Sequence, residues 1–65
     1  MELQVFELLN SKINDRAAEL KEFLSDGGCK SFDHYKEVCG AIRGLRTAQM
    51  ELNDLVRKLK EADDE

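Results

Sequence analysis

The clearest pattern in the chain is a stripe of apolar residues between Tyr35 and Leu59, spaced alternately three and four positions apart. The stripe consists of Tyr35, Val38, Ile42, Leu45, Gln49, Leu52, Val56 and Leu59, and we call it the seam. This spacing reproduces the a and d positions of a heptad, which form one face of an α-helix. A β-strand would need an apolar residue at every second position instead. The pattern therefore predicts a long amphipathic helix whose seam packs against another helix.

A second amphipathic helix is predicted from about residue 2 to residue 25. Its apolar stripe consists of Phe6, Leu9, Ile13, Ala17, Leu20 and Leu24, and it is widened by Val5, Leu8 and Phe23. A stripe broader than an a and d seam suits a helix that has more than one neighbour. We expect Asn10, Ser11 and Asn14 on the opposite side of this helix, away from its apolar stripe.

A pair of glycines separates the two stripes and predicts where the chain turns. Glycine just past a helix end adopts the left-handed conformation without a clash at Cβ, so Gly27 and Gly28 are expected to end the first helix. Ser31 has the character of an N-cap for the second helix. A Gly-rich turn over residues 26–31 is short enough to join antiparallel helices. The expected fold is therefore all-α, an antiparallel two-helix hairpin.

The whole chain, residues 1–65, is predicted to be a single αα-hairpin domain. Its second helix should cover about 32–61, followed by an acidic tail at 62–65. At 1.5 Å per residue this helix is about 45 Å long against about 36 Å for the first, so its last two turns should project. An apolar projection without a partner is costly, and so small a domain is marginal unless stapled or oligomeric. We therefore expect two hairpins to assemble into a four-helix bundle, or one hairpin to dock on a larger protein.

Small residues on the second helix predict a close contact with another helix. Gly40, Gly44 and Ala48 follow one another at intervals of four. Each glycine inside a helix costs about 1 kcal/mol relative to alanine, so two of them call for a reason. We interpret them as a smooth groove that a neighbouring helix approaches closely, the alternative being neutral drift at exposed sites. Ala41 and Leu55, at g positions of the heptad, widen the apolar face, so this helix could contact two neighbours.

Three polar residues of the second helix are candidates for specific contacts. Gln49 occupies an a position, where a polar residue can fix register or oligomeric state at some cost in stability. A glutamine at the edge of the seam, reaching solvent, is the alternative. Arg43 and Arg46 have no acidic residue three or four positions away, so we expect them to bind carboxylates of a partner or a phosphate. Asp54, in contrast, should pair with Lys58 one helical turn later.

The charge and hydropathy of the chain exclude several classes of protein. A formal net charge of −4 argues against general nucleic-acid binding, because backbone phosphates need a basic footprint. No apolar run approaches the roughly 18 residues that a membrane span requires. Met1 is followed by Glu2 rather than by a basic signal peptide. We therefore expect a protein that is neither secreted nor inserted in a membrane.

The residues that usually carry chemistry are few. Cys29, His34 and Cys39 form a Cys-x4-His-x4-Cys spacing that matches no common zinc pattern and lacks a fourth ligand. About seven helical residues separate the two cysteines, too far for a disulfide, so both are predicted to be free thiols. A Cys–His nucleophile pair would need direct contact and a third orienting group. We predict no catalytic site, no metal site and no cofactor.

The middle of the chain carries several short motifs. It reads Gly27-Gly28-Cys29-Lys30-Ser31-Phe32-Asp33-His34-Tyr35-Lys36, followed by Cys39-Gly40-Ala41-Ile42-Arg43-Gly44-Leu45. This segment resembles short proteins encoded in the head and packaging gene clusters of tailed double-stranded DNA bacteriophages. Those proteins have a Gly-rich turn, a helix start of the form Phe/Tyr-x-x-Tyr-Lys and a Gly-x-Ile-x-Gly-Leu segment, followed by an acidic C-terminus. The two cysteines do not belong to that pattern.

The resemblance implies a small helical accessory protein of the virion or of its assembly, found in the host cytoplasm or the virion. Tyr35, Gly40, Gly44 and Leu45 match the motif positions, with implied structural roles. We therefore predict a non-enzymatic protein–protein interaction module that acts through the seam, on further copies of itself or on a larger phage structural protein. The alternatives are a dimeric RNA-binding hairpin similar to the repressor-of-primer proteins, and a small phage inhibitor of a host protein.

Overall fold

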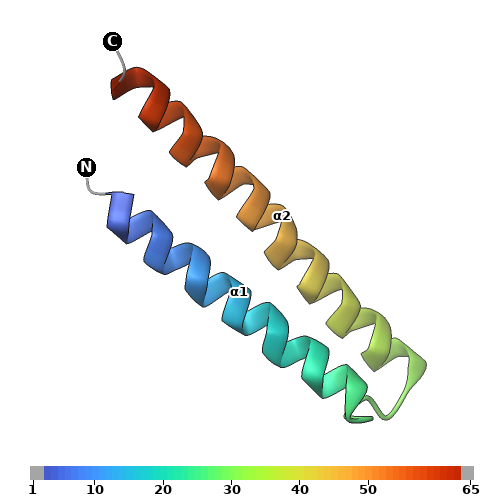
Figure 1. Cartoon of the computed structure of the whole chain (residues 1–65). Helices are drawn as coiled ribbons and strands as arrows, with labels where there is room; N and C mark the ends of the chain where they lie inside the picture. Colours follow the sequence, from blue (N-terminus) through green and yellow to red (C-terminus); the bar gives the residue numbers. More distant parts are fainter. Residues whose placement is uncertain (1–2, 64–65) are drawn as a thin grey trace.

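The computed structural model describes residues 3–63 as two antiparallel α-helices joined by a short turn (Figure 1). Helix α1 spans Leu3–Ser25 and helix α2 spans Phe32–Asp63. The helical hairpin expected from the two apolar stripes is thus confirmed. Helix α2 continues to Asp63, so residues 62 and 63, which were predicted to belong to an acidic tail, are helical. The last two residues of that predicted tail, 64–65, lie outside the described part of the chain.

The end of α1 is fixed by a Schellman motif, in which backbone N–H groups beyond the helix bond back to its last free carbonyls. The N–H of Gly28 donates to the carbonyl of Phe23 at 2.9 Å, and the N–H of Gly27 donates to that of Leu24 at 3.1 Å. Gly27 has a φ of 74°, in the left-handed region that favours glycine. A Cβ at Gly28 would overlap the Phe23 ring. The turn therefore requires glycine at position 27, and a side chain at position 28 would have to displace the Phe23 ring.

The start of α2 is capped by Ser31, as its sequence predicts. The Ser31 hydroxyl oxygen accepts a hydrogen bond from the backbone N–H of His34 at 3.1 Å. The Ser31 carbonyl accepts the first backbone hydrogen bond of the helix, from the N–H of Tyr35 at 3.0 Å. Asp33 lies in the first turn, where its negative charge is favourable against the helix dipole.

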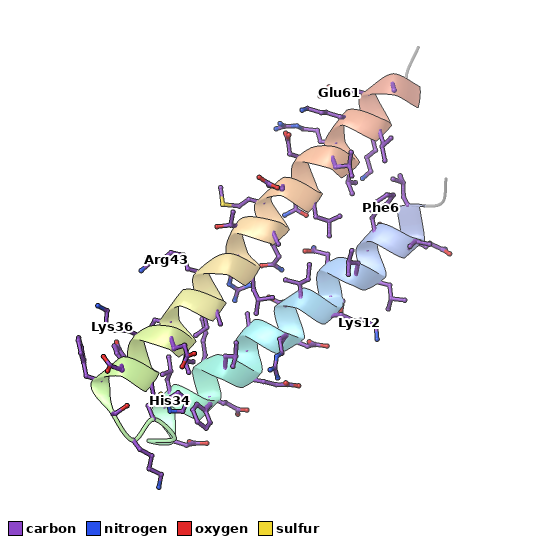
Figure 2. The ribbon with its side chains drawn as sticks, turned by 180° about the vertical axis from the view of Figure 1, so that it is seen from behind. Phe6, Lys12, His34, Lys36, Arg43 and Glu61 are labelled. Carbon is purple, nitrogen blue, oxygen red and sulfur yellow. The ribbon has the colours of Figure 1, made fainter. Side chains whose placement is uncertain are left out.

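The core of the hairpin is thin, because two helices share only one face. Ala17 is fully buried and Val38 is 8% exposed, and no other residue with a described side chain is as deeply buried. Most seam residues are half-buried against α1, and half-buried apolar residues of α1 face them, including Phe6 (Figure 2). No large side chain among those described is fully buried. The fold therefore leaves much of its apolar surface in water.

The stripe of α1 that faces α2 differs from the six-residue stripe predicted for this helix at one position, where Asn10 takes the place of Leu9. Leu9, placed in the stripe by its apolar side chain, is 46% exposed, whereas Asn10 is half-buried and faces α2. The sequence alone permits both, because a helix can continue from Phe6 to Ile13 through a step of three then four, or four then three. The placement of Asn10 and Asn14 on the side of α1 away from α2 was wrong, because both side chains accept hydrogen bonds from residues of α2.

The contact between Asn10 and Gln49 also sets the register of the two helices. Seven residues before Asn10 is Leu3, and seven residues after Gln49 is Val56, so the first described residue of α1 lies opposite Val56. Residues 57–63 of α2 extend past that point by about 10 Å. Figure 1 shows this projection at the red end of the hairpin.

Candidate interaction surface

The seam lies between the two helices. Val38 is buried and Ile42, Leu45, Gln49, Leu52, Val56 and Leu59 are half-buried, while Tyr35 is exposed near the turn. Their partners on α1 include Ala17, which has no exposed surface. The seam is thus occupied along most of its length by α1 of the same chain. A seam contact with another protein stays a prediction, and the surface available for one is elsewhere on the hairpin.

A polar layer interrupts the seam near its middle. Gln49 donates from Nε2 to the Oδ1 of Asn10 at 3.1 Å, and its Oε1 accepts a hydrogen bond from Arg46 Nη1 at 2.6 Å. The same Arg46 nitrogen donates to the Oδ1 of Asn14 at 2.9 Å. Gln49 therefore has partners inside the seam, which favours its interpretation as a residue that fixes register over that of a solvent-reaching glutamine.

The two arginines expected to bind a partner have different surroundings. Arg46 is half-buried and its guanidinium is engaged with Asn14 and Gln49. Arg43 is exposed and lies on the side of α2 away from α1 (Figure 2). The Arg43 carbonyl accepts a hydrogen bond from the Thr47 hydroxyl at 3.0 Å, and this contact leaves the guanidinium in solvent. Arg43 is thus the more accessible of the two for an acidic group.

The small residues of α2 are open to solvent. Gly40, Gly44 and Ala48 are all exposed. A Cβ built at Gly40 or Gly44 meets no described atom within 4 Å. Helix α1 therefore does not make the close approach that these residues predict. The groove interpretation stays a prediction, and it now concerns a second chain.

One flank of the hairpin is apolar on both helices. The Phe23 and His34 rings are in edge contact, with centroids 5.6 Å apart, so these residues mark the same side of the hairpin. Leu9 lies two heptads before Phe23 on α1, and Ala48 lies two heptads after His34 on α2, so both share that side. We call the apolar members of this surface the apolar flank; they are Val5, Leu9, Phe23, Ala41, Gly44, Ala48 and Leu55, and the remaining c positions on this side are charged.

Every member of the apolar flank is exposed. The larger side chains have exposed fractions of 61% for Val5, 46% for Leu9, 38% for Phe23 and 45% for Leu55. One ion pair lies on the same side of the hairpin. Arg16 Nη1 is 3.3 Å from Glu19 Oε2, and both residues belong to α1. The flank is therefore apolar with small residues at the centre of its α2 half, whereas its α1 half is interrupted by Arg16 and Glu19.

The opposite flank is polar. The hydrogen bond between Arg46 and Asn14 marks it, because both residues lie at e positions of their heptads while Leu9 and Ala48 lie at g positions. The other e positions of the described helices are held by Glu7, Lys21, Phe32, Cys39, Asn53 and Lys60. Only the first two e positions of α2, Phe32 and Cys39, carry side chains that are neither charged nor amides. The contrast between the flanks was not evident from either helix alone.

The turn end of the hairpin carries an aromatic cluster. The rings of Phe32 and Tyr35 stack at 6.3 Å between centroids, and the Lys36 ammonium lies 5.6 Å from the centre of the Phe32 ring. A hydrogen bond to the Cys39 side chain, and then the charge of its thiolate, raise the pKa of Tyr35 above its ordinary value. Cys29 and Cys39 are both free and half-buried, in agreement with their prediction as thiols.

The outer surface of α2 carries a small charge network. Lys58 Nζ lies 3.2 Å from Asp54 Oδ2, the pairing expected from their spacing, and Arg57 also contacts this carboxylate. The hydrogen bond from Lys58, together with its charge, lowers the pKa of Asp54 below its ordinary value. An open depression of about 410 Å³ beside the network is lined by residues of α2 alone, among them Met50 and Asn53.

Two further findings concern residues 3–63. No three His, Cys, Asp or Glu side chains in this part of the chain gather closely enough to hold a metal ion. Neither helix, over the same residues, is long and apolar enough to cross a membrane.

Comparison with known proteins adds no relative to this description. No family model, no curated protein and no solved structure matches the chain.

Proposed function

We propose that this chain is a non-enzymatic protein–protein interaction module, and that it serves as a small accessory protein of a phage virion or of its assembly. The observation that carries the proposal is the apolar flank, which leaves Leu9 and Leu55 about half exposed on one side of the hairpin. Exposed apolar residues gathered on one side of a small protein are typical of a surface that binds another protein.

The heptad positions support this proposal. A helix that packs against one neighbour needs apolar residues at a and d only, whereas a helix in the core of a bundle also has them at e or g. Both helices carry apolar residues at g, represented by Leu9 on α1 and Leu55 on α2. Fully burying a leucine contributes about 1.5–3 kcal/mol, so covering the exposed half of each would add about 1 kcal/mol. The flank is thus suited to a further helical layer.

The phage setting rests on the motif resemblance of the segment around the turn. Of the positions that match, Leu45 is half-buried in the seam, and Gly40 and Gly44 face solvent beside or within the apolar flank. These placements fit structural roles, with Leu45 holding the hairpin together and the glycines keeping the flank smooth. The partner surface is accordingly assigned to the flank rather than to the seam, because α1 already occupies the seam.

A pair of photo-crosslinking variants tests the proposal. A photoreactive amino acid replaces Leu9, on the apolar flank, or Ala18, an exposed residue at a b position of the same helix. After irradiation of cells that produce the variants, we expect protein adducts from position 9 and few from position 18, identified by gel shift and mass spectrometry. Protease should remove these adducts and nuclease should not.

Two results would contradict this function. Equal adduct yields from positions 9 and 18 would mean that the flank has no special role in binding. Nuclease-sensitive adducts from either position would favour the RNA-binding hairpin instead.

A further inference from the structure

We propose that the partner of the apolar flank is a second copy of this chain, so that two hairpins close into a four-helix bundle. This inference rests on the proposed function, because it names the occupant of the same surface. Three features of the structure carry it: the surface area of the single hairpin, the width of the flank, and the distribution of large and small residues along it.

The single hairpin exposes more surface than a compact protein of its mass. Its accessible area is 5259 Å², whereas the scaling of area with mass gives about 4,200 Å² for a folded monomer of 7.4 kDa. The excess of about 1,000 Å² is comparable to the roughly 800 Å² that each partner contributes to a standard interface. Covering one flank would therefore lower the area that each chain exposes to near that of a compact monomer of the same mass.

The flank spans both helices, which favours a partner of two helices. On α1 it runs from Val5 to Phe23, about 27 Å at the helical rise, and on α2 it runs from Ala41 to Leu55. A second copy of the hairpin has the same two helices and therefore the same apolar residues at its g positions. When such flanks meet, each copy covers the surface that the other leaves in water, and each helix gains a second neighbour.

The flank combines large residues at the open end of the hairpin with small residues in the middle of α2. Leu9 and Leu55 lie near the open end of the hairpin, while the middle of α2 carries only the small residues Ala41, Gly44 and Ala48. A Cβ at Gly44 would meet no described atom within 4 Å. A surface with both protrusions and a low region can be complementary to itself, as the isologous interface of a twofold dimer requires. The glycine that costs helix stability in one chain thus allows the close approach of another.

Solution mass is the first test. Sedimentation equilibrium of the wild-type chain, from micromolar to millimolar concentration, should give a species of twice 7.4 kDa that dissociates on dilution. A mass of 7.4 kDa throughout this range would overturn the proposal, whether or not the chain is helical.

A matched pair of substitutions tests the surface. Ala48→Glu places a charge at the centre of the flank, and Ala18→Glu makes the same change at an exposed helical position outside it. Because a buried charge without a partner is strongly unfavourable, Ala48→Glu should raise the dimer dissociation constant by about 100-fold or more. Ala18→Glu should change it by less than about threefold. Equal effects of the two substitutions would refute the assignment of the flank.

A measurement on the wild-type chain covers the case in which Ala48→Glu fails to fold. Backbone amide signals in nuclear magnetic resonance spectra should move on dilution for residues of the apolar flank, such as Leu9 and Ala48. Those of the polar flank, such as Asn14, should move least. Changes centred on the polar flank would place the contact there and overturn the proposal.

The two proposals fail in different ways. If the chain is monomeric but a crosslinker at position 9 captures a different protein, the second copy is excluded and the interaction function stands. If position 9 captures no protein in cells and the purified chain is monomeric, both are wrong.

Discussion

Among single residues, the polar layer at Gln49 has the largest influence on how the helices meet. Its side chain bonds to Asn10 and accepts a hydrogen bond from Arg46, and all three are half-buried. A net hydrogen bond contributes only about 1 kcal/mol, and full burial of two leucines in place of the two amides would contribute more. We infer that the layer selects one register rather than maximising stability.

Replacing both amides tests this inference. The double variant Asn10→Leu/Gln49→Leu should raise the free energy of unfolding by about 1–2 kcal/mol, because apolar contact replaces a weak polar one. Asn10→Leu alone should gain less, since Gln49 then loses a partner inside the seam. Urea denaturation followed by circular dichroism measures both. A double variant less stable than the wild type would mean that the polar layer is itself a main source of stability.

Asp54 gives a prediction about pH. Its pKa is lowered chiefly by the hydrogen bond and charge of Lys58, so Lys58→Met should return it toward the ordinary value. Because the folded-state pKa is lowered, the contribution of this pair to stability is present above the ordinary carboxyl pKa and is lost as the pH falls through the lowered one. The carboxyl carbon signal of Asp54, titrated by nuclear magnetic resonance, should shift at a lower pH in the wild type than in Lys58→Met. Coincident titrations would show that the pair does not form in solution.

The sequence predicts where the helices lie better than it predicts which residues of each helix face the other. The heptad of the seam marked Gln49 correctly as an a position, since its neighbours Leu45 and Leu52 leave no other phase. On α1, Leu9 and Asn10 fit the helical period equally, and choosing the apolar residue gave the wrong one. Only the contact with Gln49 on the other helix decides between them.

At the scale of elements, the turn is the best determined part of the hairpin, because its signals are local. The positive φ at Gly27 and the close approach of the Phe23 ring to Gly28 involve residues that are near one another in the sequence. The Ser31 cap is equally local. These signals were predictable from the sequence for that reason. The apolar flank was not, because it depends on which side of α1 faces α2.

Two glycine substitutions should have opposite effects on stability. Gly27→Ala forces alanine into the left-handed region and should lower the free energy of unfolding by about 1 kcal/mol. Gly40→Ala adds a methyl group where no described atom lies within 4 Å and improves helix propensity, so it should raise the free energy of unfolding by up to about 1 kcal/mol. Thermal or urea denaturation of the two variants side by side measures both. Equal signs would contradict the assignment of the helix end.

At the scale of the whole molecule, the hairpin is an elongated rod of 53 × 16 × 13 Å. In this shape the core never becomes thick enough to enclose a large side chain, which is why Ala17 and Val38 are its most buried residues. Residues 57–63 of α2 add length without a facing turn of described helix. If two hairpins pair as proposed, stability to urea should increase with protein concentration, as mass action requires when the folded form associates.

The short turn also has a consequence for the time course of folding. Once the turn at residues 26–31 has formed, each further helical turn of α1 can pack against the facing turn of α2 next to a pair of turns that is already packed. Short loops close in about 10–100 ns and helical elements form within about a microsecond, so the hairpin itself should assemble quickly. Two chains at micromolar concentration meet far more slowly. A slow refolding phase whose rate rises with protein concentration would therefore report the association of two chains rather than the folding of a single hairpin.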